Sequence, residues 1–424
     1  MAGILARLGI FYGWWIVFAT ASIVFLSAGT FFYGFSLLVG PLTTEFGWSR
    51  ASISAAFSLR TEVGGIAAPL VGFLVDKIGV RLITIIGLFI VTAGYLLVAR
   101  VDSLLGFYIA IFILAIGMSG TGGANANTAI SAWFRRNRGK ALGLMTLGGG
   151  AGGLSTIVFA QLITEFGWRE ALTILGVAQF VVCLPLALSL RNKPEDLGLE
   201  PDGVTAPPVT AGSIATIVGA KPLAIGPEIT SREALRSPLF WKVALVFALS
   251  NFATTAMIVH QVPFLIEQVG MSDSLAAASI SIMTGISIVG RLGFGGAADR
   301  YSSTLIMAFG LALTAIGLVL FSMVQEPWHV AIALPFFSIG FGAAIPLRSV
   351  IQAEYFGLRA FGAIQGLIMT VTTVFAFIGP VMAGVLYDSS ESYRLAFVLL
   401  AAGPALGIPL VLSLRADKPA SVAA

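Results

Sequence analysis

Stretches of mostly apolar residues, each long enough to cross a lipid bilayer, recur along almost the whole chain. A spanning helix needs roughly 20 such residues, and each stretch here is bounded by charge, glycine or proline. The twelve stretches cover residues 14–38, 51–75, 82–99, 105–131, 141–164, 171–190, 240–265, 275–298, 304–324, 328–351, 363–386 and 391–413. With 57% hydrophobic and only 10% charged residues in 424, no soluble core could bury the apolar surface. We therefore expect an all-α membrane protein with twelve transmembrane helices.

Composition and motifs exclude several other classes of protein. The single cysteine, Cys183, rules out an internal disulfide framework and a cysteine-based zinc site. The nucleotide-binding pattern GxxxxGK[ST], the metal-binding pattern HExxH and the nucleophile pattern GxSxG do not occur in the soluble segments. We therefore expect no enzyme, no cofactor and no metal, and an energy source other than ATP.

The basic residues indicate how the helices are oriented. If the N-terminus is cytoplasmic, 18 of the 24 Lys and Arg residues fall at or near the inner surface, and only Arg50, Arg100, Arg169 and Arg394 face outward. Positive charge concentrates on the cytoplasmic side of membrane proteins. We therefore expect both termini in the cytoplasm, a plasma (inner) membrane location and no nucleic acid partner for the net charge of +4. The first stretch is expected to be a retained helix rather than a signal peptide.

One long polar stretch and a repeat divide the chain into two halves. Gly72–Lys77 (GFLVDK) recurs 223 positions later as GGAADR, and Trp133-Phe134 recurs 222 positions later as Tyr355-Phe356. Two anchors with nearly the same offset indicate a duplicated six-helix unit. We therefore predict pseudo-symmetric six-helix bundles at 1–190 and 240–424, the second with a short cytoplasmic tail, joined by a cytoplasmic linker at 191–239.

These segments resemble a known family. The stretch GFLVDKIGVR at 72–81 resembles the loop signature GxxxD[RK]xGx[RK] of the major facilitator superfamily. Others are similar to the group of monocarboxylate transporters and oxalate:formate antiporters, namely FYGWW at 11–15, YGFSLLVGPL at 33–42, FGWSR at 46–50, WFRRNRGKALGL at 133–144, PEDLGLEPDG at 194–203 and GRLGFGGAADR at 290–300. The resemblance implies the major facilitator fold and transport by alternating access between the halves.

The two copies of the loop signature are candidates for a conformational latch. A carboxylate at the cytoplasmic end of a helix can accept from the N-terminal NH groups of a neighbouring helix while the inner side is closed. Alternatively, the basic residues of the signature only anchor the topology. The latch candidates are Gly72, Asp76, Lys77, Arg81, Asp299 and Arg300.

Charged side chains at mid-depth are the first candidates for substrate and proton sites, because the bilayer disfavours ions that lack a partner. The resemblance implies that Arg291 binds a substrate carboxylate; a structural role, paired with Glu62 or with a cluster of carbonyl groups, is the alternative. Glu62 is a candidate proton carrier, or else the fixed counter-charge of Arg60 or Arg291. His260, near the outer end of helix seven, is a second proton candidate or an interfacial hydrogen-bonding residue.

Uncharged polar side chains complete the candidate substrate site. They are Tyr33, Asn125, Asn127, Asn251 and Thr370, of which the two helix-four asparagines would face either a cavity or a neighbouring backbone. Oxalate-exchanging relatives carry a second cation in helix eleven, whereas residues 365–386 here contain no Lys or Arg. A monocarboxylate therefore fits better than a dicarboxylate, unless Arg60 supplies the second charge.

The sequence thus predicts a secondary transporter of a small organic anion, driven by proton symport or by exchange for a counter-anion, and working as a monomer in the lipid bilayer. One alternative is transport or efflux of a larger or neutral compound such as a drug or vitamin. An alternative from another class is a non-transporting membrane sensor. The short linker and the lack of a soluble output domain weigh against the sensor.

Overall fold

The computed structural model describes residues 11–134, 137–203, 229–298, 300–357 and 360–414. These residues form helices and connecting turns, with no strand among them. The chain divides into two compact units: unit 1 comprises Met1–Trp48 and Leu59–Pro208, and unit 2 comprises Ser49–Ser58 and Val209–Ala424. Helix α4 (Arg50–Ile78) therefore begins in unit 2 and continues in unit 1.

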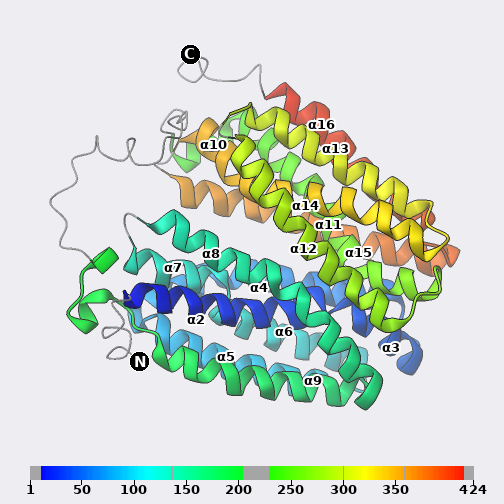
Figure 1. Cartoon of the computed structure of the whole chain (residues 1–424), viewed down its shortest axis with the longest axis horizontal. Coiled ribbons are helices and arrows are strands. Elements are labelled where there is room, and N and C mark those ends of the chain that lie inside the picture. Colours follow the sequence, from blue (N-terminus) through cyan, green and yellow to red (C-terminus); the bar gives the residue numbers. More distant parts are fainter. Residues whose placement is uncertain (1–10, 135–136, 204–228, 299, 358–359, 415–424) are drawn as a thin grey trace. The chain divides into compact units, whose positions relative to one another are not determined.

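Unit 1 contains most of α4 and the remaining helices of the first half. They are α2 (Tyr12–Ser27), the π-helix η1 (Ala28–Tyr33), α3 (Ser36–Phe46), α5 (Val80–Val98), α6 (Leu104–Thr121), α7 (Gly123–Trp133), α8 (Arg138–Ala151), the 3-10 helix η2 (Gly152–Ser155), α9 (Thr156–Ser189), η3 (Pro194–Leu197) and η4 (Pro201–Gly203). Helix α5 packs on α6 and α9, and α2 packs on α8 and α9 (Figure 1). Tyr12, Trp133 and Phe134 are large buried side chains of one core cluster.

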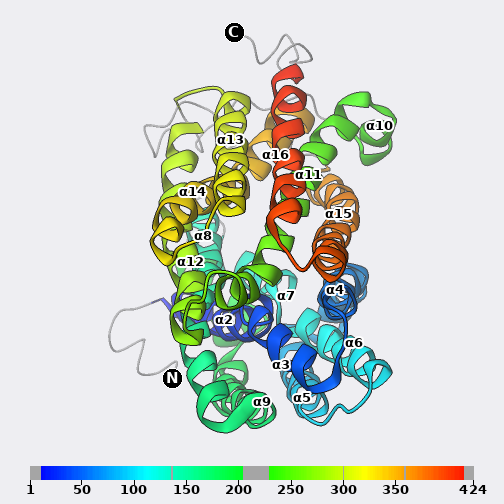
Figure 2. The ribbon, with the colours of Figure 1, turned by 90° about the vertical axis from the view of Figure 1, so that its right-hand side faces the viewer.

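Unit 2 contains the helices of the second half. They are α10 (Ser231–Arg236), α11 (Pro238–Glu267), α12 (Asp273–Ala298), α13 (Ser303–Ser322), α14 (Pro327–Phe356), α15 (Phe361–Ser390) and α16 (Arg394–Ser413). Helix α11 packs on α15 and α16, α13 on α14 and α16, and α12 on α14, as Figure 2 shows for the neighbouring α13 and α16.

Glycines determine where helices turn and where they approach closely. Gly79 has φ 85° in the tight turn between α4 and α5, and Gly357 ends α14 with φ 72°. Where α12 crosses α14, a side chain at Gly290 would run into the carbonyl oxygen of Ile339 and lie 3.2 Å from the Cα of Gly342. This backbone contact fixes α12 against α14 and, with it, the residue that follows Gly290.

The described helices are long and apolar enough for a membrane protein. Ten stretches qualify as membrane spans by length and composition, and one of them, Lys140–Ser189, has 50 residues and is divided by Gly167, where φ is 80°. Helix α4 is not among the ten, but it has 29 residues; its charged side chains are Arg50, Arg60, Glu62, Asp76 and Lys77. With Lys140–Ser189 taken as two and α4 included, the described residues accommodate the twelve predicted spans. The predicted all-α membrane fold is confirmed.

The predicted bundle boundaries at 190 and 239 stay a prediction, because residues 204–228 lie outside the described part of the chain. The first linker residues do pack on unit 1. The indole of Trp133 donates to the carbonyl of Arg191 at 3.1 Å, and Asn192 accepts from the backbone NH of Arg81 at 3.3 Å.

Candidate functional site

Arg291 lies on α12, seven residues or about 10 Å before the helix ends at Ala298. Its guanidinium carbon is 5.9 Å from the ring centroid of Phe341 on α14. The side chain is half-buried, and its Nε is buried without a hydrogen-bond acceptor among the described residues. A guanidinium presents five donors in a planar fork. Arg291 therefore has donors available for a ligand.

Arg348 is a second cation inside unit 2, and it was not among the mid-depth charges predicted from the sequence. It lies eight residues, about 12 Å, before the end of α14 at Phe356. The apolar stretch 328–351 placed Arg348 close to an inner boundary, whereas the helix continues to Gly357. Had Gly357 been recognised as the end of the helix, Arg348 would have been predicted about two turns before that end.

The neighbours of Arg348 are uncharged. Its guanidinium carbon is 5.3 Å from the ring centroid of Phe247 on α11. The Nη2 donates to Asn251 Oδ1 at 3.5 Å, and the Nη1 donates to the sulfur of Met369 on α15 at 3.3 Å. The Nε is buried with no acceptor among the described residues. Asn251 and Arg348 are thus brought together, within unit 2.

The other uncharged polar residue predicted in unit 2, Thr370, lies on the exposed face of α15. Thr370 is exposed, and its hydroxyl donates to the carbonyl of Gly366 at 3.1 Å. It follows Met369, whose side chain contacts Arg348. Thr370 therefore lies one residue from the Arg348 cluster but makes no described hydrogen bond to it.

In unit 1, Arg60 and Glu62 lie ten and twelve residues after the start of α4, roughly 15 and 18 Å along its axis. The guanidinium carbon of Arg60 is 5.4 Å from the ring centroid of Phe32. Tyr33 is buried at the end of η1, and its ring meets that of Phe32 edge-on at 5.0 Å. Glu62 is half-buried, and its Oε1 is buried without a donor among the described residues.

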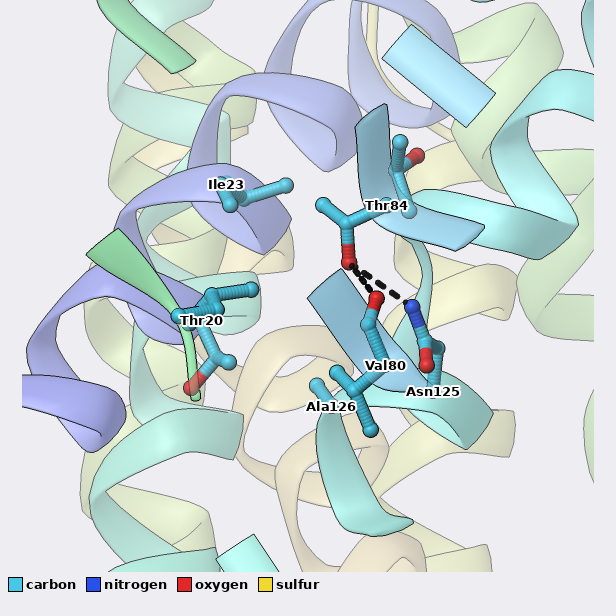
Figure 3. Close-up of a pocket in the computed structure, with 8 residues that line it drawn as sticks. Thr20, Ile23, Val80, Thr84, Asn125 and Ala126 are labelled. Atoms are coloured by element: carbon cyan, nitrogen blue, oxygen red, sulfur yellow. Dashed lines mark hydrogen bonds between the residues drawn. The ribbon is translucent and has the colours of Figure 1, made fainter. Parts of the chain in front are cut away.

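Asn125 bridges three helices of unit 1. Its side-chain amide donates to the hydroxyl of Thr84 on α5 at 2.9 Å and to the carbonyl of Gly120 on α6 at 2.6 Å. Figure 3 shows Thr84 in turn donating to Val80, beside a cavity of about one water molecule that Asn125 lines. Both predicted environments, a cavity and a neighbouring backbone, thus meet at Asn125. Asn127 is exposed.

His260 is fully buried on α11 and belongs to a polar cluster in unit 2. Its Nδ1 is 3.0 Å from the hydroxyl of Tyr393, and its Nε2 is 2.9 Å from the carbonyl of Pro380 and 3.1 Å from the hydroxyl of Ser54. The Tyr393 hydroxyl also accepts from Arg50. His260 is therefore linked to the first turns of α4.

Arg50 is the centre of this cluster. Its guanidinium forms an ion pair with Glu267 at the end of α11 and stacks 3.8 Å from the ring centroid of Tyr387. The carboxylate of Asp388 accepts from the backbone NH groups of Arg50 and Ala51 at 3.1 and 3.0 Å. A carboxylate at these orphan NH groups stabilises a helix N-terminus. The sequence had given no sign of these partners, which are more than 200 positions apart.

The predicted latch residues are described only in part. Lys77 is exposed, with its Nζ 4.3 Å from the ring centroid of Phe73. Arg81 is half-buried and Arg300 is exposed. Asp299, the surroundings of Gly72 and the side chain of Asp76 lie outside the described part of the chain. The latch stays a prediction.

Comparison with known proteins identifies the family. The family model described as Major Facilitator Superfamily matches residues 18–370 and 294–424. The chain belongs to the major facilitator superfamily. It is therefore a membrane transporter protein by family and not an enzyme, as predicted.

Individual members of the superfamily resemble the chain over most of its length. The oxalate:formate antiporter of Oxalobacter formigenes is 26% identical over 336 residues, which cover 77% of this chain and 73% of that protein. Monocarboxylate transporter 13 of Bos taurus is 26% identical over 92% of this chain and 86% of its own. A bacterial homologue of the human lysosomal transporter Spinster, solved in an inward-facing and occupied conformation, has a TM-score of 0.75 at 15% identity, covering 97% and 98% of the two chains. This structural likeness shows the fold alone.

Proposed function

We propose that this protein is a secondary active transporter of a small organic anion, with a monocarboxylate as the favoured substrate. The observation that carries the proposal is Arg291, a half-buried guanidinium in a membrane span with a buried donor that no described residue accepts from. Burying a guanidinium without a counter-charge costs free energy, which an anionic ligand offsets. A carboxylate matches the fork of donors in two parallel hydrogen bonds.

The relatives support the same class of substrate. One is named for oxalate and formate and others for monocarboxylates. Transport proceeds by alternating access of the two halves, with both termini in the cytoplasm. Glu62 is the proposed proton carrier for symport, while anion exchange needs none. A drug or vitamin transporter is less well supported, because a neutral substrate leaves Arg291 without a counter-charge.

Counterflow in proteoliposomes tests this function. Vesicles containing the purified full-length protein are loaded with one compound and assayed for uptake of labelled lactate, oxalate, choline and glucose. We expect trans-stimulated uptake of at least one carboxylate and of neither choline nor glucose. Uptake of only the neutral or cationic compound would contradict the proposal, and a lack of counterflow with any of a broad panel of solutes would favour the sensor.

A further inference from the structure

The geometry points to Arg348 as a second anion-binding point, so that the protein binds small dicarboxylates more tightly than monocarboxylates of the same chain length. This inference rests on the proposed function, in which Arg291 binds the first carboxylate. Arg348 lies on α14, the tenth span. If it binds substrate, two arginines rather than Arg291 alone bind the substrate in the C-terminal half.

The surroundings of Arg348 leave its charge uncompensated within the described residues. Its acceptors are the amide oxygen of Asn251, at the 3.5 Å limit of a hydrogen bond, and the thioether of Met369. The ring of Phe247 adds a cation-π contact at 5.3 Å. No carboxylate of the described residues forms an ion pair with Arg348, and its buried Nε has no acceptor there. A cation held this way in a low-dielectric site is expected to attract an anion.

The contacts of Arg348 extend from the interior of unit 2 to an exposed stretch of α15. Phe247, which stacks near the guanidinium, is fully buried, whereas Met369, which accepts from it, is 45% exposed. Thr370, next to Met369, is exposed as well. Arg348 therefore lies at the boundary between the interior of unit 2 and an open face, which is where a ligand-binding side chain is expected.

The places at which the two arginines meet α14 favour a ligand with two charged ends. Phe341, which contacts Arg291, and Arg348 are seven residues apart on α14, so they lie on the same face of that helix about 10 Å apart along its axis. One carboxylate is too small to span two such points. A dicarboxylate with several methylene groups between its carboxylates is the class of ligand that can engage both, and oxalate is too short to do so.

Equilibrium binding to the purified full-length protein in nanodiscs tests the inference. Matched pairs of equal length are compared by calorimetry: butyrate with succinate, pentanoate with glutarate, and hexanoate with adipate. For at least one pair we expect the dicarboxylate to bind about tenfold more tightly or better, because one charge-assisted hydrogen bond contributes roughly that much. Arg348→Gln should reduce this ratio to about one while leaving monocarboxylate affinity within about twofold.

Two further variants separate the possible outcomes. Arg236→Gln, which removes one positive charge from the exposed face of α10, should keep the wild-type ratio. Arg291→Gln should weaken both members of every pair. If the ratio persists in Arg348→Gln while Arg291→Gln weakens both ligands, Arg348 is structural and the proposed function stands. If Arg291→Gln leaves both affinities unchanged, the proposed function itself is wrong.

Arg348→Lys keeps the test decisive if the Gln variant fails to fold. Lysine retains the charge but not the planar fork, so the ratio should fall severalfold rather than vanish. An unchanged ratio in this variant, or a wild-type ratio near one for all three pairs, overturns the inference.

Discussion

Arg291 contributes two separate properties, a positive charge and a planar fork of donors. Lysine supplies the charge but cannot make two parallel hydrogen bonds to one carboxylate. We therefore predict that Arg291→Lys lowers counterflow of the transported carboxylate by about tenfold or more, with the thermal unfolding temperature nearly unchanged. Arg236→Lys serves as the matched control on an exposed helix. Wild-type affinity and turnover in Arg291→Lys would show that bidentate binding at this residue is not needed.

Glu62 has a half-buried carboxyl group in a span, with one buried oxygen that accepts from no described residue. A proton would satisfy such a group, because a neutral acid is far cheaper to bury than an anion. We predict that Glu62→Gln, which stays neutral, loses accumulation driven by an imposed pH gradient but keeps substrate exchange. Accumulation at the wild-type level in Glu62→Gln would make Glu62 a structural residue and would direct the next test to His260.

How well the site could be predicted depended on where each charge stands in the sequence. Arg60, Glu62 and Arg291 interrupt long apolar stretches, so the sequence alone made them candidates, and α4 places the first two ten and twelve residues after its start. Arg348 was missed because its helix continues beyond the apolar stretch to Gly357. The hydropathy of a sequence indicates that a span exists. It does not show where the helix ends, because that depends on local residues such as Gly357.

At the scale of helices, small residues decide how closely α12 and α14 approach and hence where Arg291 meets Phe341. Gly290 and Gly285 are a matched pair on α12: a Cβ at Gly290 meets backbone of α14, whereas a Cβ at Gly285 has nothing within 4 Å. We predict that Gly290→Ala destabilises the protein by about 1–3 kcal/mol, as overpacking does, and that Gly285→Ala is nearly neutral. Thermal unfolding followed by tryptophan fluorescence compares them. Equal unfolding temperatures for the two variants would contradict this account of the crossing.

A second contact joins α3 to the kink in α9. The indole of Trp168 donates to Glu45 at 2.7 Å, and Arg169 pairs with the same carboxylate while also donating to the carbonyl of Val101 at 2.9 Å. The hydrogen bonds from Trp168 and then Arg169 hold the pKa of the Glu45 carboxyl below its usual value of 4.5. A lowered folded-state pKa means that this contact stabilises the protein above about pH 4.5 and is lost as the pH falls through the lowered value.

We therefore predict that Glu45→Gln is slightly less stable than wild type at pH 7, by less than about 1 kcal/mol because the pair is exposed. The difference should disappear as the pH is lowered toward 3, since the wild-type carboxyl is then protonated too. Unfolding temperatures of both proteins across this range provide the measurement. A difference that is constant with pH would mean that the charge of Glu45 contributes nothing.

At the scale of the whole molecule, the repeat of Gly72–Lys77 at an offset of 223 predicted two related halves, and the family match agrees. The sequence did not predict that α4 begins in one compact unit and continues in the other. That arrangement depends on Arg50, Glu267 and Asp388, which only the folded chain brings together. Contacts between residues so distant in sequence leave no periodic pattern, so they could not be read from a single chain.

The start of α4 is held by α11 and α15 within unit 2, while the rest of the helix belongs to unit 1. Asp388 caps its first NH groups, and the ion pair of Arg50 with Glu267 holds its first side chain. In the proposed orientation this is the outer end of the helix. If these contacts exist only while the outer side is closed, removing them favours the outward-open state, because a two-state equilibrium shifts by the interactions lost from one state.

We predict that Asp388→Asn with Glu267→Gln shifts the protein toward outward-open, whereas Asp76→Asn and Asp299→Asn at the opposite end shift it toward inward-open. Single cysteines placed near each end, with Cys183 replaced by alanine, report the shift through labelling by an impermeant maleimide. Asp273→Asn, at the exposed start of α12, is the control for loss of one negative charge. If the contacts of Arg50 and the loop signatures at Asp76 and Asp299 stabilise opposite states, the two sets of variants must change cysteine labelling in opposite directions. A change in the same direction in both sets, or no change in either, would refute the mechanism.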